Sequence, residues 1–445
     1  MDINGGGDYL GLELALAAGE KNIYVKDGLY ELTDTILVTV NSVIVEGESK
    51  DGVILRMINN QKDLLVIKSN DVVIKNLTLD TKTHNAQAAL VEAGGNNILI
   101  DNNNILGGEN IFSIYFAGPP VSSIGSNCEG CVTRDETINV YIENGESSFD
   151  FSMNNIVSNN YISSEFVGDG ASFSLQKNGE FINNILEGAM LSVYMDKDCV
   201  VSGNTINNSL QHGIYLTFPS ENILLSGNKI RNPRFNGIVA KPQYAEHGHQ
   251  DERIISENII ITDNIISSNL NGINAQGYDS DHSTWGRVKD VFIENNIIEQ
   301  FDFSGIWLYD FENTVVKYNE INFSSCTTST QGTDVDGDGS ADIPTPAARD
   351  SAGIWLYDRL LGVEISNNSI SKLSNCNDVA VAQNAITISN ASISAPEIED
   401  VQINSNSFSN LISDWIHSSD GIDIQNSDVS SEVSSSGNSN IVTVN

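Results

Sequence analysis

An asparagine recurs at one place in a short repeated pattern, and this repeat restricts the fold more than any other feature of the chain. The pattern is apolar-x-apolar-x-x-Asn-x-Ile. Successive asparagines are 24, 20 and 24 residues apart at first, and later gaps are 36, 32, 23, 49 and 38 residues. They are Asn160, Asn184, Asn204, Asn228, Asn264, Asn296, Asn319, Asn368 and Asn406. A minimum spacing of about 20–24 residues, with a variable number of extra residues in some repeats, indicates one coil that is stacked many times and has loops inserted at its corners.

Each repeat predicts short strands, because its apolar residues alternate with period 2 and not 3.6. A second repeat accompanies the asparagines and contains Gly-Ile or a variant of it, as in HGIYL, NGIVA, NGINA, SGIWL, AGIWL and DGIDI. Its Ile points inward and the residues on either side of it point outward. One coil cannot bury its apolar face alone, but stacked coils share a core. Asparagine tolerates the left-handed corner conformation, and its amide can bond the asparagine of the next coil.

The beginning of the chain differs from the repeats. Residues 8–18 have an amphipathic helical pattern, and we expect this helix to cap the open end of the core, within an N-terminal cap of residues 1–30. The segments NIYV and DGLY then fit a first strand and turn. The remaining pattern leaves little room for a second fold, so we predict one domain over 1–445, with inserted loops at 119–150, 242–253, 277–290 and 325–350.

Charge excludes two classes of partner. The 445 residues contain 22 basic and 59 acidic side chains, and the net charge is −37. Such a chain lacks the basic face that binds nucleic acid, and anionic lipid would repel it. The sequence contains no run of about 18 apolar residues, so it predicts no membrane span. The sequence contains no basic segment followed by an apolar stretch, so it predicts no signal peptide. If the protein is extracellular, we expect that it leaves its cell by another route, such as lysis, or that the sequence has been shortened.

These repeats resemble the pectate-lyase-like proteins, whose fold is the right-handed parallel β-helix. That group includes polysaccharide lyases, polygalacturonase-type hydrolases, mannuronan C5-epimerases and phage tailspikes. The opening GGGDYLGLELALAAG also resembles their N-terminal cap. The resemblance implies an all-β solenoid of about 11–13 coils with an N-terminal capping helix. It implies a polysaccharide partner and an extracellular setting, at a cell surface or on a virion. Spikes of this fold are often trimers, so a homotrimer is a further expectation.

Aromatic residues recur at outward positions of the Gly-Ile strands. Pairs two residues apart are expected to align from coil to coil, so that Tyr194 and Tyr215 lie on adjacent coils, as do Trp307 and Trp355. Rows of aromatic and polar groups suit sugar rings, which have apolar faces and hydroxyl edges. Alternatively, the rings stack on each other and cover the sheet. The predicted substrate-binding residues are Tyr194, Tyr215, Gln276, Trp307, Tyr309, Trp355 and Tyr357.

The loops after residues 241 and 276 contain half of the six histidines. Residues 229–289 carry seven basic and seven acidic side chains, and are therefore neutral in a strongly acidic chain. A base, an acid and a cation are what removal of a proton beside a carboxylate requires. The predicted catalytic residues are Lys241, Tyr244, His247, His249, Tyr278, Asp281, His282 and Arg287.

For a lyase or epimerase acting on uronates, roles can be assigned within this set. Arg287 or Lys241 pairs with the sugar carboxylate, and His282 or Lys241 takes the C5 proton. Tyr278 or Tyr244 donates a proton to the leaving oxygen, or to the opposite face of the sugar. The segment YDSDH at 278–282 resembles the Tyr…Asp-x-His arrangement of mannuronan epimerases.

Other functions stay open. Asp310 and Asp358, with Asp196 further along, could act as the paired carboxylates of a hydrolase. The histidines of His247-x-His249 could bind a metal with His282 and Asp281. A non-catalytic tailspike, adhesin or surface module would need only the aromatic rows.

A calcium site is predicted in the segment TDVDGDGSADIP. Asp334, Asp336, Asp338 and Asp342 stand at positions 1, 3, 5 and 9, with Gly339 at position 6, which is the spacing of an Asp-rich calcium loop. The segment resembles the loops of dockerins and thrombospondin type 3 repeats. Position 12 holds Thr345 and not Glu, so the segment is not an EF-hand. We expect structural Ca²⁺ here. The sequence does not decide whether two cysteine pairs, Cys128 with Cys131 and Cys326 with Cys376, form disulfides or are free thiols.

Overall fold

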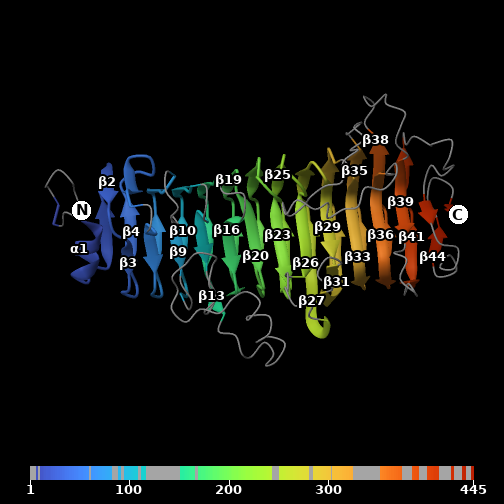
Figure 1. Ribbon diagram of the computed structural model, residues 1–445, viewed down its shortest axis with the longest axis horizontal. Helices are drawn as coiled ribbons and strands as arrows, with labels where there is room; N and C mark the ends of the chain where they lie inside the picture. The colour runs from blue at the N-terminus through green and yellow to red at the C-terminus, as the bar shows by residue number, and fades with distance from the viewer. Residues whose placement is uncertain are drawn as a thin grey trace. The chain divides into compact units, whose positions relative to one another are not determined.

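A computed structural model describes most of the chain as strands (Figure 1). The described residues are 7–8, 11–59, 62–82, 89–91, 95–108, 112–116, 151–165, 169–242, 250–279, 284–301, 303–323, 351–372, 383–389, 398–409, 422–424, 433–436 and 442–444. The chain forms two compact units, Met1–Leu224 (unit 1) and Leu225–Asn445 (unit 2).

A short helix, α1 (Leu12–Ala17), precedes the strands of unit 1. Its buried residues are Leu12, Ala15 and Leu16, which lie on one face of the helix. Gly11 is the N-cap residue in an extended conformation. The helix closes with backbone bonds from the Ala18 N–H to the Leu14 carbonyl and from the Gly19 N–H to the Leu16 carbonyl. The helix predicted within residues 8–18 is therefore confirmed, with tighter bounds.

Three strands make each coil, and each joins a different row of parallel strands. We call these rows the first, second and third sheets, although corner pairings such as β31 with β33 join the first and third. In unit 1 the first sheet contains β1 (Asn22–Val25), β4 (Ile44–Gly47), β7 (Val73–Lys75), β10 (Leu99–Asp101), β14 (Ile156–Ser158), β18 (Glu180–Ile182) and β21 (Val200–Ser202). The second contains β2 (Gly28–Leu32), β5 (Val53–Met57), β8 (Thr78–Asp80), β11 (Asn104–Leu106), β15 (Tyr161–Ser163), β19 (Ile185–Glu187) and β22 (Thr205–Asn207). The third contains β3 (Ile36–Val38), β6 (Leu65–Ile67), β9 (Ala89–Val91), β12 (Ile114–Phe116), β16 (Asp169–Ser174), β20 (Met190–Tyr194) and β23 (Ile214–Phe218). Short strands β13 (Ser152–Met153) and β17 (Gln176–Lys177) pair at a corner.

Unit 2 repeats the arrangement. Its first sheet contains β27 (Gln250–Thr262), β31 (Thr284–Glu294), β34 (Val315–Lys317), β37 (Glu364–Ser366), β41 (Val401–Asn404) and β44 (Val433–Ser436). Its second contains β25 (Lys229–Arg231), β28 (Ile265–Ser267), β32 (Ile297–Glu299), β35 (Glu320–Phe323), β38 (Ser369–Lys372) and β42 (Ser407–Ser409). Its third contains β26 (Ile238–Pro242), β29 (Asn271–Gln276), β33 (Ser304–Glu312), β36 (Ser351–Leu361), β39 (Gln383–Ser389), β43 (Ile422–Ile424) and β45 (Val442–Val444).

Three further strands lie at corners or bounds. Strand β24 (Glu221–Ser226) includes the bound between the units. Strand β30 (Tyr278–Asp279) pairs antiparallel with β31, and β40 (Ile398–Glu399) pairs with β36. Residues 284–290, predicted as loop, belong to β31, because the chain there continues its pairing with β27 and β33 around the corner. In the described part of the chain, the second sheet has thirteen strands, one from each coil. This number agrees with the 11–13 coils predicted.

The core is built from apolar residues that align from coil to coil. On the second sheet of unit 1, Ile162, Leu186 and Ile206 are in register and completely buried. Neighbouring strands lie about 4.8 Å apart, so these side chains are in van der Waals contact along the stack. Their neighbours in sequence point outward, and Ile185 is 47% exposed. The period-2 pattern thus sets the inner and outer faces of each sheet.

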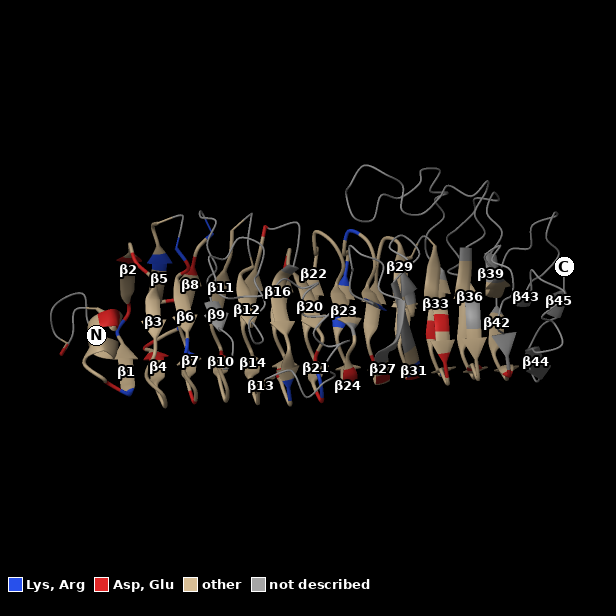
Figure 2. Ribbon diagram, turned by 60° about the horizontal axis from the view of Figure 1, so that its bottom comes forward, with Lys and Arg blue, Asp and Glu red and all other residues tan. Residues whose placement is uncertain are grey.

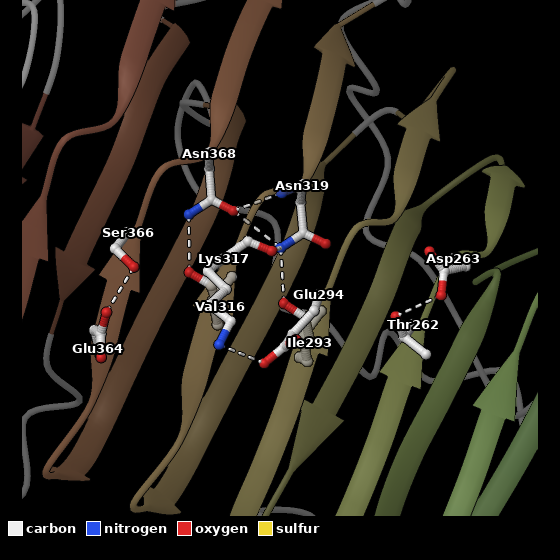
Figure 3. Close-up of polar contacts among 10 residues, drawn as sticks. All are labelled: Thr262, Asp263, Ile293, Glu294, Val316, Lys317, Asn319, Glu364, Ser366 and Asn368. Atoms are coloured by element: carbon white, nitrogen blue, oxygen red, sulfur yellow. Dashed lines mark hydrogen bonds and ion pairs between the residues drawn. The ribbon is translucent and has the colours of Figure 1, made fainter.

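The repeated asparagines form a buried hydrogen-bonded ladder. In unit 2, Asn319 Nδ2 donates to Asn368 Oδ1 at 2.9 Å and to the Ile293 carbonyl at 2.8 Å (Figure 3). Asn368 Nδ2 in turn donates to the Val316 carbonyl, and its Oδ1 accepts the Asn319 backbone N–H. Each ladder amide therefore satisfies backbone groups of the preceding coil and so links two coils.

The left-handed corner residue is the one before each ladder asparagine, and not the asparagine itself. Asn183, Asn295 and Asn367 have φ near +55°, and Gly203 and Gly227 fill the same position. Asn and Gly reach this conformation at low cost. Tyr318 is an exception, with φ 56° and an exposed side chain.

Candidate functional site

The third sheet of unit 2 aligns the predicted aromatic and polar residues. Trp307 is in register with Trp355, and Tyr309 with Tyr357. The same two rows begin with Asn274 and Gln276 on β29 and continue to Thr387 and Ser389 on β39. This alignment was expected from the Gly-Ile repeat, because Ile306 and Ile354 also pair and are fully buried on the opposite side.

The rings of this surface pack closely on each other. Phe303 lies with its ring centroid 4.7 Å from that of Trp355 and 5.7 Å from that of Trp307. The centroids of Trp307 and Trp355 are 6.4 Å apart, and those of Tyr309 and Tyr357 are 5.0 Å apart in an edge-to-face arrangement. We name these five residues the aromatic face. Trp307, Trp355 and Tyr357 are half-buried, so part of each ring remains accessible.

Two polar atoms in the row that contains Trp307 and Trp355 have no hydrogen-bond partner in the described structure. They are Trp307 Nε1 and Thr387 Oγ1, both buried, on either side of Trp355 in the same row. Gln276, at the other end, is half-buried, and its Nε2 donates to Asn274 Oδ1 at 2.9 Å. The surface thus combines apolar ring area with polar groups at both ends.

The third sheet of unit 1 differs from the prediction in its register. Tyr194 pairs with Ser174 and with Thr217, whereas Tyr215 pairs with Ser192. The two tyrosines lie on adjacent coils but two residues out of register, because the repeat alone does not fix where each strand begins after its corner. Tyr194 is 1% exposed, and Tyr215 is half-buried against His212, at a centroid distance of 5.6 Å.

Asp196, at the corner after β20, is completely buried. Its Oδ1 accepts the Gln176 backbone N–H at 2.8 Å, while Oδ2 has no partner in the described structure. Burial raises the pKa of Asp196 well above its ordinary value, and the Gln176 N–H offsets this in part. Burial likewise raises the pKa of the Cys199 thiol, and the Asp196 charge adds to that effect.

Asp196 belongs to a polar column that the repeat analysis missed. Asn155 Nδ2 donates to Gln176 Oε1 at 2.8 Å, and the Asp196 N–H donates to Ser220 Oγ at 3.2 Å. The four residues are Asn155, Gln176, Asp196 and Ser220, about one coil apart in sequence. Because their residue types differ, no repeated letter marks this column in the sequence.

Most of the predicted catalytic residues lie outside the described residues. Lys241 is half-buried near the end of β26. Tyr278 and Arg287 belong to β30 and β31, where Tyr278 pairs with Trp285, but their side chains are not among those described. Tyr244, His247, His249, Asp281 and His282 fall outside the described ranges. The prediction for this set stays a prediction.

The predicted calcium ligands Asp334, Asp336, Asp338 and Asp342 also fall outside those ranges. Where the structure is described, no three His, Cys, Asp or Glu residues are grouped to hold a metal ion. Cys199 is buried and has a free thiol, and the other four cysteines are not described. No helix within the described ranges is long and apolar enough to cross a membrane.

Comparisons with solved structures identify the fold. The A-module of mannuronan C-5 epimerase AlgE4 from Azotobacter vinelandii aligns with a TM-score of 0.50 and 12% identity, covering 93% of this chain and 91% of that one. The surface adhesin PfbA of Streptococcus pneumoniae aligns at 0.48 and 11% identity, over 84% and 89%. The Dettilon tailspike protein gp208 aligns at 0.44 and 13% identity, over 97% and 68%. The chain is a right-handed parallel β-helix.

No family model matches the sequence, and no curated protein matches it in the corresponding search. At 12% identity the likeness to AlgE4 concerns the fold alone. The chemistry of this β-helix therefore has to be argued from its own residues. Of these, Phe303 and Thr387 were absent from the predicted site. Phe303 precedes β33 and was missed because it lies at a corner, outside the Gly-Ile strand pattern.

Proposed function

We propose that this β-helix binds a polysaccharide along the aromatic face of unit 2. The observation that carries the proposal is the row Asn274, Trp307, Trp355 and Thr387, aligned over four coils with half-buried indoles at its centre. Coils repeat about every 4.8 Å, so a linear polymer lying along the row meets equivalent groups at regular intervals. Sugar rings present apolar C–H faces to indoles and hydroxyls to amides.

We propose further that the polymer contains uronic acid and that the chain acts on it as a lyase or C5-epimerase. Lys241 ends the strand that neighbours Asn274, since Val239 pairs with Asn274 on β29. A base there, Lys241 or His282, would remove the C5 proton, while Arg287 stabilises the charge that develops on the carboxylate. A proton returned by Tyr278 or Tyr244 to the other face inverts C5. Expulsion of the C4 oxygen instead leaves a C4–C5 double bond. AlgE4 is named for the first of these outcomes.

A non-catalytic glycan binder is the second candidate. Phe303, Trp307 and Trp355 pack against one another, so their rings already stabilise the sheet without any ligand. The solved structures with this fold include an adhesin and a tailspike by name. Such a protein needs affinity but no acid or base.

The test combines binding and turnover on the full chain. Absorbance near 235 nm, measured on alginate, pectate, glycosaminoglycans and bacterial capsules with and without Ca²⁺, reports the unsaturated product of elimination. Incorporation of deuterium at C5 from heavy water, followed by NMR, reports epimerisation. His282→Ala and Lys241→Ala should abolish either signal. Binding without either signal, on all these polymers, would favour the non-catalytic candidate.

Variants of the aromatic face and of Gln276 beside it separate binding from catalysis. Trp355→Leu and Gln276→Ala should each weaken polysaccharide binding about tenfold, because each removes one ring or amide contact. Circular dichroism confirms that the variants fold. Unchanged affinity in both folded variants would overturn the placement of the polymer on this face.

We also propose structural calcium at Asp334, Asp336, Asp338 and Asp342, an extracellular setting and a homotrimer. The donor spacing supports the calcium proposal, since hard carboxylate oxygens at alternate positions converge on one cation. Metal analysis after dialysis should find one calcium per chain, and Asp336→Asn should lose it. Light scattering measures the oligomeric state directly.

A further inference from the structure

A basic patch lies on the second sheet of unit 2, away from the aromatic face. Lys229 and Arg231 are exposed on β25 and flank the buried Ile230, so both point outward, about 7 Å apart along the strand. Arg234 is exposed on the corner that follows. We name these three residues the basic patch.

The basic patch is exceptional for its charge. Residues 222–245 contain four basic side chains and no Asp or Glu, in a chain whose acidic residues outnumber its basic ones 59 to 22. Figure 2 shows how sparse the basic residues are along the ribbon. Local charge of this sign must overcome the field of the whole chain to attract an anion, and an acid-free segment is the arrangement that allows it.

The patch cations are also unpaired within the described structure, unlike others in unit 2. Lys289 pairs with Glu257, and Lys317 pairs with Glu294 at 3.0 Å. Lys229 and Arg231 face Ile265 and Ser267 on the next strand, which are neutral. On this side of β25, the acid aligned with Arg231 among the described residues of unit 2 is Glu299, one strand further and about 10 Å away along the sheet. Three cations that have no acidic partner among the described residues leave their charge available to a ligand.

The corner that carries Arg234 is rigid. Asn271 Nδ2 donates to Asn236 Oδ1 at 2.7 Å, and Ser304 Oγ donates to Asn271 Oδ1 at 2.6 Å. This second column of buried polar residues ties the corner to the next two coils. Phe235 is buried beside it, and its ring centroid lies 5.0 Å from the Arg234 guanidinium carbon. The backbone that carries Arg234 is thus fixed, and the Phe235 ring restricts its side chain before any ligand binds, which lowers the entropy lost on binding.

We infer that the basic patch is a second docking surface for an acidic polysaccharide, outside the aromatic face. The inference rests on the proposed polysaccharide-binding function and adds a contact on a different sheet. Arginine and lysine at fixed spacing suit the carboxylate or sulfate groups of successive sugars. The corner leads directly into β26 and Lys241. A polysaccharide bound by the basic patch can therefore extend around the same coil toward the third sheet.

The test is fluorescence anisotropy of labelled oligouronates and a labelled neutral dextran with the full chain, at low and moderate NaCl. The variant combines Lys229→Gln, Arg231→Gln and Arg234→Gln. Its matched control combines Lys21→Gln, Lys50→Gln and Lys177→Gln in unit 1, which removes the same charge elsewhere. We expect the patch variant to lose about tenfold in affinity for the oligouronate and to show a flatter salt dependence, by roughly two counterions. The control should lose little.

The outcomes distinguish this inference from the proposed function. Equal losses in the patch variant and the control would overturn the inference and leave the proposed function standing. Equal affinity for dextran and oligouronate in the wild type would overturn it as well. Binding of a DNA duplex as tight as that of the oligouronate would show a general anion surface and overturn it. If no glycan binds and Trp355→Leu has no effect, the proposed function fails together with the inference.

Discussion

Asn319 donates a hydrogen bond from its side-chain amide to the Oδ1 of Asn368, although 49 residues separate the two in sequence. The inserted segment between them leaves the corner geometry unchanged, with the backbone N–H of Asn319 on the same oxygen at 3.0 Å. The ladder therefore tolerates insertions at the other corners of the coil. A β-helix can acquire new loops in this way without losing its core.

Replacing Asn319 by Leu should destabilise unit 2 by about 3 kcal/mol or more, since the Asn296 backbone N–H and the Ile293 carbonyl lose their partner in the interior. Urea unfolding measures the change in the free energy of unfolding. The control is Ser369→Ala on the next coil, where the side chain is exposed. An equal effect of the two substitutions would contradict the structural role of the ladder.

Tyr318→Asn should stabilise the protein by about 1 kcal/mol. Tyr318 has φ 56° where other coils have Asn, Asp, Gly or Ser, and a bulky residue is strained in that conformation. The comparison is Tyr24→Asn, because Tyr24 is similarly exposed and also has a lysine ammonium near its ring. We expect Tyr24→Asn to be neutral or destabilising, because Tyr24 lies in a strand. Thermal unfolding of both variants decides the point.

Asp196→Asn should stabilise unit 1 at neutral pH by about 1 kcal/mol or more. Burial raises the pKa of Asp196 in the folded state, so the charged carboxylate destabilises the folded protein at that pH, and the neutral amide does not. An Asp in the unfolded chain titrates at about pH 4. Below that pH, the neutral acid therefore makes its full contribution to the free energy of unfolding of the wild type. This contribution falls as the pH rises toward the folded-state pKa and is constant above it. The difference between variant and wild type should therefore grow with pH from about 4.

Urea titrations between pH 4 and 8 measure that difference. Asp8→Asn is the control, because Asp8 is exposed in the same unit. Taking the difference between the two variants removes the general effect of the large negative charge. A pH-independent difference would contradict burial of an uncompensated carboxyl group at Asp196.

Thr387→Val should be neutral or stabilising, by up to about 1 kcal/mol, because it removes a buried hydroxyl that has no partner in the described structure. Thr314→Val is the matched case: Thr314 is equally buried, but its hydroxyl donates to the Glu312 carbonyl at 3.3 Å. We expect Thr314→Val to destabilise by about 1 kcal/mol. If Thr387 meets a sugar hydroxyl, its variant should also bind polysaccharide less tightly, which isothermal titration calorimetry would measure.

Added NaCl should raise the free energy of unfolding. The net charge of −37 makes repulsion between acids stronger than the attraction within the exposed ion pairs, such as Lys26 with Glu48. Salt screens both interactions, with a Debye length near 10 Å at 0.1 M, and relief of the stronger repulsion therefore decides the sign. Urea midpoints in 0.05 and 1 M NaCl would show the shift. A fall in the midpoint would mean that the ion pairs dominate.

The order of strands, the inner and outer faces and the alignment of Trp307 with Trp355 follow from the sequence. These features depend on local periodicity, since period 2 sets which side chains face the core, and Gly-Ile marks equivalent positions in successive coils. The capping helix was predictable for the same reason. Asparagine identity also indicated the ladder, although the left-handed residue is the one before it.

Tertiary structure alone decided the remaining features. The register of Tyr194 and Tyr215 depends on the length of the corners between strands, which a repeat motif does not specify. The burial of Asp196, and the lack of an acidic partner for Arg231 among the described residues, depend on which groups lie beside them in neighbouring coils. Sequence periodicity records how one coil is built, whereas charge pairing and desolvation are properties of residues brought together from several coils.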